Sequence, residues 1–385
     1  MPQSHRPHPP NSSASSRLLT RVLRPTPLKP ALLLTEVLLA GMLLLTLVAP
    51  LQAETQWDAT TIQTNLRRTV ATLSTDIGER NADAPLNYLR AAAFISDQLA
   101  LWGVPLESLR LITDPPSPPV IVATFGPEPS PAAHNPAPLT KPGQPTPSAS
   151  EQPASSTPDT APHLLLCAHY DTVPGSPGAN DNASGVAVLL ELARLLADAP
   201  PPVRLQIALF PNEEEPHFMT PASGSVRYAE QLAMRSALPL RVIAVDSMGW
   251  TGKDAGWRAF MNFSKGNLTV GARPESRPLA DNLTQTLSRI TDTAAVVTRD
   301  GAFWIDKSDH APFVARGCQG VLLTAPGTLA YPCLHLGCDT PEKLDYKTME
   351  MTVHGLLEFI AQQPSPPPHR DHTETLIDSG DKQGA

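Results

Sequence analysis

Apolar residues follow two different spacings along this chain. Apolar positions three and four residues apart mark one face of a helix, whereas short continuous apolar runs are typical of strands buried on both faces. The first pattern predicts helices at Gln56–Leu73, Ala84–Leu101, Gly185–Asp198, Pro278–Ile290, Ala311–Arg316 and Met349–Gln362. The second pattern predicts strands at Val120–Phe125, His163–His169, Val203–Phe210, Leu240–Val245 and Gly320–Leu323.

The predicted strands alternate with the predicted helices, which indicates an α/β fold in which helices cover both faces of one sheet. A doubly wound sandwich of this kind brings the carboxyl ends of its parallel strands to one edge. Open α/β sheets hold their ligands at that edge. We therefore expect functional residues just after the strands.

The amino-terminal part of the chain differs from the rest. Residues 1–30 form a basic segment predicted to be disordered, and residues 1–35 contain five Lys/Arg and no acidic residue. The apolar run that follows predicts a signal peptide over residues 31–53 or an uncleaved membrane anchor over residues 31–51. In either case the following domain is expected to be exported to the periplasm or the extracellular side. Contact with the membrane is expected through this segment alone.

Proline is concentrated in one internal stretch. Residues 127–162 hold 11 of the 44 prolines, together with Ser, Thr and Ala. Such a composition buries too little apolar surface to offset the entropy of ordering, so a disordered insertion is predicted there, and a disordered tail at residues 364–385. The remaining domain spans residues 54–363. The net charge of −8 and the lack of a basic stripe exclude a nucleic-acid-binding surface.

Three of the predicted strands lead into histidine or acidic residues. His169 ends one strand and Asp171 lies two residues later; Glu213 and Glu214 follow the next strand; Asp246 follows the third. Each has an ordinary reading, because a histidine at a strand end is usually structural and consecutive acids usually face solvent. A carboxylate at the end of a buried strand, however, is costly unless it is paired or bound to a metal.

Three further candidates lie in loops. Asp181 stands in a Gly/Asn-rich turn before a helix, and Asp309 stands at the start of a short helix; both could be helix-capping residues. His335 lies between Cys333 and Cys338, which are close enough to be bridged, although the sequence leaves their pairing open. Imidazole and carboxylate ligands together suit zinc, and this number of them suffices for two zinc ions that share a bridging ligand.

Taken in order, these residues resemble the motifs of the co-catalytic (double-zinc) aminopeptidase family of zinc exopeptidases. That group contains secreted bacterial leucyl-type aminopeptidases, glutaminyl cyclases and glutamate carboxypeptidase II. The matching stretches are residues 168–173, 178–185, 210–214, 245–249, 308–313 and 335–340. The resemblance implies a doubly wound α/β/α sandwich with a mixed, mostly parallel central sheet.

The resemblance also implies a ligand set for two zinc ions. His169 and Asp246 would bind one ion, Glu214 and His335 would bind the other, and Asp181 would bridge both. In relatives the peptide bond after the bridging aspartate is often cis.

The catalytic roles follow from the same resemblance. Glu213 would be the general base for a water that bridges the two metals, Asp171 would orient His169, and Asp309 would lie near the site rather than on the metal. The implied function is a zinc-dependent aminopeptidase that hydrolyses the N-terminal bond of peptides with a free N-terminus.

Two alternatives share these motifs. A glutaminyl-peptide cyclotransferase-like enzyme has the same fold, but relatives of that type carry an aromatic residue before the last histidine, where this chain has Leu334. A non-catalytic scaffold of the same fold would lack metal ligands, which are all present here. Glu215 leaves a second register for the glutamate pair, 214/215, but the resemblance favours Glu213 and Glu214, because the spacing of three residues from Phe210 to Glu213 fits the family pattern.

Overall fold

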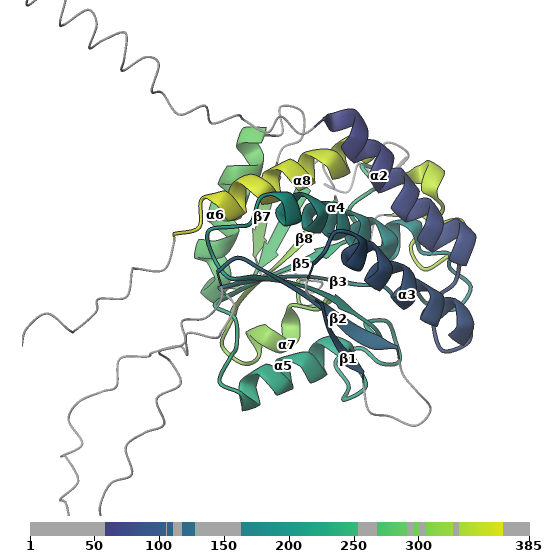
Figure 1. Cartoon of the computed structure of the whole chain (residues 1–385), viewed down its shortest axis with the longest axis horizontal. Helices are drawn as coiled ribbons and strands as arrows, with labels where there is room; N and C mark the ends of the chain where they lie inside the picture. Colours follow the sequence, from purple (N-terminus) through teal and green to yellow (C-terminus); the bar gives the residue numbers. More distant parts are fainter. Residues whose placement is uncertain are drawn as a thin grey trace, which may run out of the picture. The chain divides into compact units, whose positions relative to one another are not determined.

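Eight strands form one mixed sheet in the order β1-β2-β4-β3-β5-β8-β6-β7 (Figure 1). The strands are β1 (Leu106–Arg110), β2 (Pro119–Phe125), β3 (Leu164–His169), β4 (Leu205–Phe210), β5 (Arg241–Asp246), β6 (Leu268–Ala272), β7 (Val296–Asp300) and β8 (Gln319–Thr324). The pairs β3–β4, β3–β5, β5–β8 and β6–β7 are parallel, and the pairs β1–β2, β2–β4 and β6–β8 are antiparallel. The expectation of a mixed, mostly parallel sheet is confirmed.

Helices cover both faces of this sheet, as predicted. One face carries α2 (Ala59–Ala71), α3 (Pro85–Leu101), α4 (Ser184–Asp198), α6 (Arg277–Ile290) and α8 (Tyr346–Ala361), and the other carries α5 (Gly224–Met234) and α7 (Ala311–Val314) (Figure 1). Successive side chains of β3 point to opposite faces of the sheet. Leu166 packs into the larger apolar core with α4, whereas Cys167 packs into the smaller core with α5 and α7. Both faces of the sheet are therefore packed against apolar cores.

Helix boundaries shift where capping residues decide them. Helix α2 begins at Ala59 rather than Gln56 because the Asp58 carboxylate accepts hydrogen bonds from the next backbone amides. Helix α8 begins at Tyr346 rather than Met349 because Asp345 caps it in the same way. The apolar pattern missed β1, β6, β7 and α5, since the three strands have five residues each and none forms a long apolar run.

The computed structural model describes residues 58–104, 106–110, 118–127, 163–252, 268–290, 296–300, 305–325 and 331–364, apart from the side chains of 106–110, 297 and 300. The predicted segments 1–30 and 31–53, and nearly all of 127–162 and 364–385, lie outside these residues. In the part that is described, no helix is both long and apolar enough to cross a lipid bilayer.

Candidate metal centre

Parallel strands bring the predicted ligands to one edge of the sheet. His169 and Asp246 are the last residues of β3 and β5, and Glu213 and Glu214 follow β4 within four residues. Because β3 lies between β4 and β5 and runs parallel to both, the three chain segments emerge side by side. Two further elements complete the site: the turn before α4 supplies Asp181, and the loop after β8 supplies His335.

The Asp181 carboxylate lies between the two histidines. Its Oδ1 atom is 3.2 Å from Nε2 of His169, and its Oδ2 atom is 3.2 Å from Nε2 of His335. On the His169 side, Asp246 Oδ1 lies 3.7 Å from the same Nε2 atom. On the His335 side, Glu214 Oε2 lies 3.3 Å from Nε2. The five side chains therefore form two groups that share one carboxylate.

These distances suit zinc. Two ligand atoms that bind one tetrahedral zinc ion at about 2.0–2.1 Å lie about 3.3 Å from each other. The separations of 3.2 Å and 3.3 Å around His335 match that value, and those around His169 are 3.2 Å and 3.7 Å. The donors are imidazole nitrogens and carboxylate oxygens, the ligand types that zinc accepts. The residues present therefore fit the metal.

The negative charges at the site also favour the binding of a cation. Glu213 and Glu214 are buried, and burial together with repulsion from neighbouring carboxylates raises the pKa of each well above its usual value. Burial disfavours a charged His169, but the surrounding carboxylates, Glu213 first among them, outweigh it and raise the pKa of the imidazole. A bound cation would relieve the repulsion among these acids.

Glu213 occupies a distinct place in the cluster. Its Oε2 atom lies 3.8 Å from Nε2 of His169, and its carboxylate lies with the imidazole of His169 and the carboxylate of Asp246 around a common centre. Glu215, the next acid but one, is exposed and lines a neighbouring pocket instead. The glutamates that reach the cluster are therefore Glu213 and Glu214.

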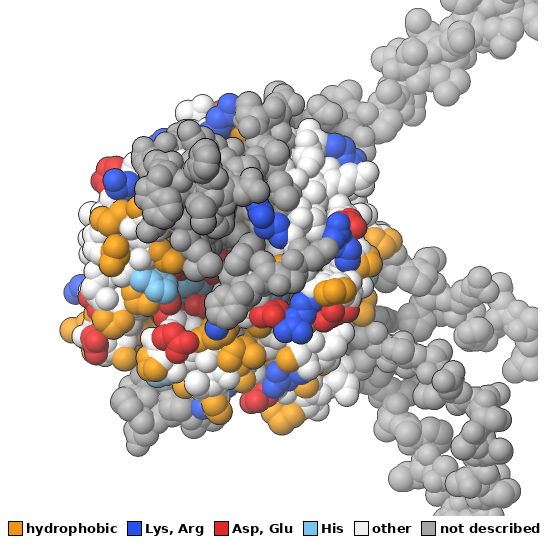
Figure 2. Space-filling view, turned by 180° about the vertical axis from the view of Figure 1, so that it is seen from behind, with side chains coloured by type: hydrophobic (Ala, Val, Ile, Leu, Met, Phe, Trp, Pro, Cys, Tyr) orange, Lys and Arg blue, Asp and Glu red, His pale blue; other side chains and the backbone are white. Residues whose placement is uncertain are grey.

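The cluster reaches the surface through His335. The His335 side chain is 47% exposed, whereas Asp181, Glu213, Glu214 and Asp246 are all buried. On the face shown in Figure 2, histidine and acidic side chains gather beside a hollow, with hydrophobic side chains next to them. An incoming molecule would thus meet one partly open histidine above a set of buried acids.

Asp171 connects the histidine to the glutamate loop. Its Oδ1 atom is 3.4 Å from Nδ1 of His169, and its carboxylate accepts hydrogen bonds from the backbone N–H groups of Glu213 at 3.1 Å and Glu214 at 3.0 Å. One side chain therefore positions both the loop after β3 and the loop after β4.

The Asp181 turn is held by Asp339, a residue for which no role was predicted. The Asp339 carboxylate accepts hydrogen bonds from the backbone N–H groups of Asn180 at 2.8 Å and Asp181 at 3.0 Å, and from the Tyr331 hydroxyl at 2.9 Å. Burial raises the pKa of Asp339 to about 6. The peptide bond between Asp181 and Asn182 is cis, as the resemblance implies. Asp339 lies within residues 335–340, one of the stretches that resemble the family, and this resemblance is the one sequence signal that could have pointed to its role.

A disulfide encloses His335. Cys333 and Cys338 are bonded, and the ring that they close contains His335 in a left-handed backbone conformation with φ of 59°. Asp339 directly follows the second cysteine. The pairing that the sequence leaves open is thus formed, and it ties His335 and the residue that supports Asp181 into one loop.

Asp309 lies near the cluster but outside it. It is buried, and burial raises its pKa to about 7. The preceding residue, Ser308, donates a hydrogen bond of 2.9 Å to Asp246 Oδ2. The neighbouring His310 is buried as well, which lowers its pKa to about 4, and it does not join the ligand groups.

Arg80 supports the loops after β3 through its side chain. Its role was not predicted from the sequence. Its guanidinium is fully buried and donates hydrogen bonds of 2.7–3.0 Å to five backbone carbonyls, those of Leu73, Gly78, Tyr170, Pro177 and Gly178. Burial lowers its pKa to about 10, so the group stays charged at neutral pH. It thereby joins the end of the first helical segment to the loops on either side of Asp171.

Replacing Arg80 with methionine should lower the free energy of unfolding by about 3–5 kcal/mol, because buried carbonyls would lose their donors. Urea unfolding of the metal-free protein measures this effect. Arg273→Met is the matched control, since Arg273 is exposed and pairs with Asp306 at the surface; it should change stability little. Equal shifts for the two variants would contradict the supporting role of Arg80.

A family model and several relatives match this chain. The model of peptidase family M28 matches residues 151–360. The chain is 28% identical over 229 residues to the uncharacterized protein YfbL of Escherichia coli, a match that covers 53% of this chain and 68% of YfbL. It is 49% identical over 51 residues to aminopeptidase YwaD of Bacillus subtilis, which is 13% of this chain and 11% of YwaD.

Solved structures share the fold. The LapA aminopeptidase of Legionella pneumophila superposes with a TM-score of 0.57 at 17% identity, over 78% of this chain and 72% of LapA. The aminopeptidase of Aneurinibacillus sp. strain AM-1 gives a TM-score of 0.56 at 16% identity, over 78% and 93% of the two chains. The glutaminyl cyclase of Bacteroides thetaiotaomicron gives 0.56 at 18% identity, over 80% and 99%.

Proposed function

This chain belongs to peptidase family M28, and from that premise we propose that it is an aminopeptidase that uses two zinc ions to hydrolyse the N-terminal bond of peptides. The observation that carries the proposal is the placement of Asp181, whose two oxygens each lie 3.2 Å from a different histidine. A carboxylate in that position can hold two metal ions side by side.

The ligands divide between the two ions. His169 and Asp246 would hold the first, Glu214 and His335 the second, and Asp181 both. When bound, such a pair of ions polarises the scissile carbonyl and makes a water molecule acidic near neutral pH. The partly exposed His335 side leaves room for the free amino group of a peptide, which favours attack on the first bond.

Glu213 is the residue proposed to move the proton. It is buried beside the ligands at 3.8 Å from Nε2 of His169, and no lysine or arginine in the described part of the chain pairs with it. In this place its carboxylate would accept the proton of the attacking water and pass it to the leaving amine. Asp171 would keep Glu213 in place through the backbone hydrogen bond and keep the ring of His169 oriented.

A glutaminyl cyclase is the second candidate, because an enzyme of that class shares the fold over most of both chains. In this chain Leu334 precedes His335 and packs beside Trp250, Tyr331 and Cys333. The aromatic residue expected in a cyclase is thus replaced by an aliphatic one. Hydrolysis is favoured on this ground.

One set of assays on purified protein separates these functions. The zinc content is measured first, with two ions per chain expected and none expected for a non-catalytic scaffold. The protein is then incubated with leucyl-alanine and with a glutaminyl dipeptide, and the products are identified by mass spectrometry. Release of free leucine supports the aminopeptidase, whereas loss of ammonia from the glutaminyl peptide without cleavage would favour the cyclase.

We also propose that the enzyme is exported to the periplasm or the extracellular side. The basic segment and apolar run at residues 1–53 support this, and the Cys333–Cys338 disulfide suits an oxidising compartment. Cell fractionation tests the proposal. The mass of the recovered protein distinguishes cleavage near Ala53 from an anchor that is retained.

A further inference from the structure

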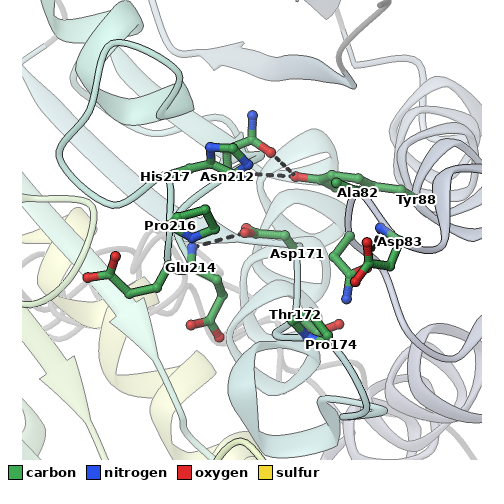
Figure 3. A pocket seen from close by; sticks show the side chains of 12 residues that line it. Ala82, Asp83, Tyr88, Asp171, Thr172, Pro174, Asn212, Glu214, Pro216 and His217 are labelled. Carbon is green, nitrogen blue, oxygen red and sulfur yellow. Dashed lines mark hydrogen bonds between the residues drawn. The ribbon is translucent and has the colours of Figure 1, made fainter.

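A pocket of 220 Å³ adjoins the metal centre on the Glu214 side. Three loops enclose it: the turn before α3 contributes Asp83, the loop after β3 contributes Pro174, and the loop after β4 contributes Glu214 and Pro216 (Figure 3). This volume is below the roughly 300–1,000 Å³ of pockets that enclose whole drug-sized ligands, so it suits a single side chain.

We propose that this pocket receives a lysine or arginine side chain of the peptide substrate. The proposal rests on the proposed peptidase function, because it assigns a substrate class to that same site. Glu214 belongs to both the ligand set and the pocket lining, so a side chain in the pocket would extend directly from a peptide held at the metals.

The walls of the pocket suit an aliphatic stem. Tyr88, Ala82, Pro174 and Pro216 supply apolar surface, and the Tyr88 hydroxyl is already paired with Asn212, to which it donates at 3.1 Å and from whose N–H it accepts at 2.7 Å (Figure 3). Lysine and arginine bury their methylene groups along surfaces of this kind while the charged end stays near water.

The carboxylates of the pocket suit the charged end. Asp83 and Glu215 are exposed, and neither forms an ion pair with a lysine or arginine of the described residues. The described lining contains no lysine or arginine, and His217 is its sole basic nitrogen group. Asp171 and Glu214 add negative charge, but they face the ligand cluster. The two exposed carboxylates therefore remain to attract a cation.

Lysine and norleucine dipeptides test the proposal, because the two side chains share a four-carbon stem and differ in charge. The ratio of kcat/KM for lysine over norleucine is measured with each residue at the first and at the second position, paired with alanine. We expect a ratio well above one at one of the two positions, which also identifies the residue that enters the pocket. The ratio should fall as the salt concentration rises.

Variants connect that ratio to the pocket. Asp83→Asn and Glu215→Gln should each lower the lysine-to-norleucine ratio about two- to fivefold, the size expected for exposed ion pairs, and the double variant should lower it further. Asp97→Asn is the matched control, because this exposed aspartate lies on α3, the helix that follows Asp83, more than three turns from the start of that helix. It should leave the ratio unchanged.

Binding measured without turnover keeps the two proposals separate. Calorimetry with the zinc-loaded Glu213→Gln protein gives the affinity ratio of the same dipeptides even if no peptide is cleaved. Equal affinities for lysine and norleucine dipeptides, or ratios that the pocket variants do not change, would overturn the pocket assignment. Cleavage of norleucine dipeptides in that case would leave the aminopeptidase proposal standing.

Discussion

Replacing Glu213 with glutamine should leave the zinc content unchanged and lower kcat for peptide hydrolysis roughly 10²–10⁴-fold, the usual contribution of a general base. The glutamine amide has nearly the shape of the carboxylate, and the backbone N–H of residue 213 can still donate a hydrogen bond to Asp171. What it lacks is the capacity to accept a proton from water. The five proposed ligands are not altered, so metal binding and catalysis should separate.

The measurement combines zinc analysis with steady-state hydrolysis of leucyl-alanine. Glu358→Gln serves as the matched control, because Glu358 is exposed on α8 and should leave both quantities unchanged. Near-normal turnover in the Glu213→Gln protein would show that Glu213 is not the base. The pair Glu214 and Glu215 would then have to be reconsidered.

Replacing Asp181 with alanine should remove both zinc ions and with them all measurable hydrolysis. Its two oxygens face His169 and His335 at equal distances, so neither metal position would keep its full set of ligands. The loss of metal affinity should exceed the roughly 10–100-fold that follows from removing a residue that supports a ligand without binding the metal.

Asp171→Asn provides that comparison within the same protein. Asp171 contacts His169 and the glutamate loop but is not a proposed ligand. Zinc titration monitored by calorimetry measures both variants, and circular dichroism checks that each is folded. An Asp181→Ala protein that still binds two zinc ions would contradict the bridging role.

Several parts of the site follow from the sequence through simple geometry. His169, Asp246 and the glutamate pair stand at the ends of apolar runs, and parallel strands must bring such residues to one edge. Asp171 could be predicted because it lies two residues after a histidine. Their places in the cluster agree with the expected fold, and their roles remain predictions for the experiments above.

Other parts of the site and fold could not be predicted, because they depend on contacts between segments far apart in the sequence rather than on the local residue pattern. Arg80 is a single charged residue in a loop, and nothing near it in sequence indicates that five carbonyls surround its side chain. Asp339 acts through backbone amides almost 160 residues away. The strands β6 and β7 are too short for a periodic signal, and they are defined by pairing with β8 and with each other.

Arg80 also shows that the ligand loops depend on residues upstream of the family match. The family match begins at residue 151 and includes every proposed ligand. A truncated protein that starts there would lose Arg80 and the two helices whose Ile62, Leu66 and Ile95 fill the larger core. Its ligand residues would all be present, yet the loops that carry them would lack their anchor. The folded domain therefore needs the helices from α2 onward, well upstream of His169, the first proposed ligand.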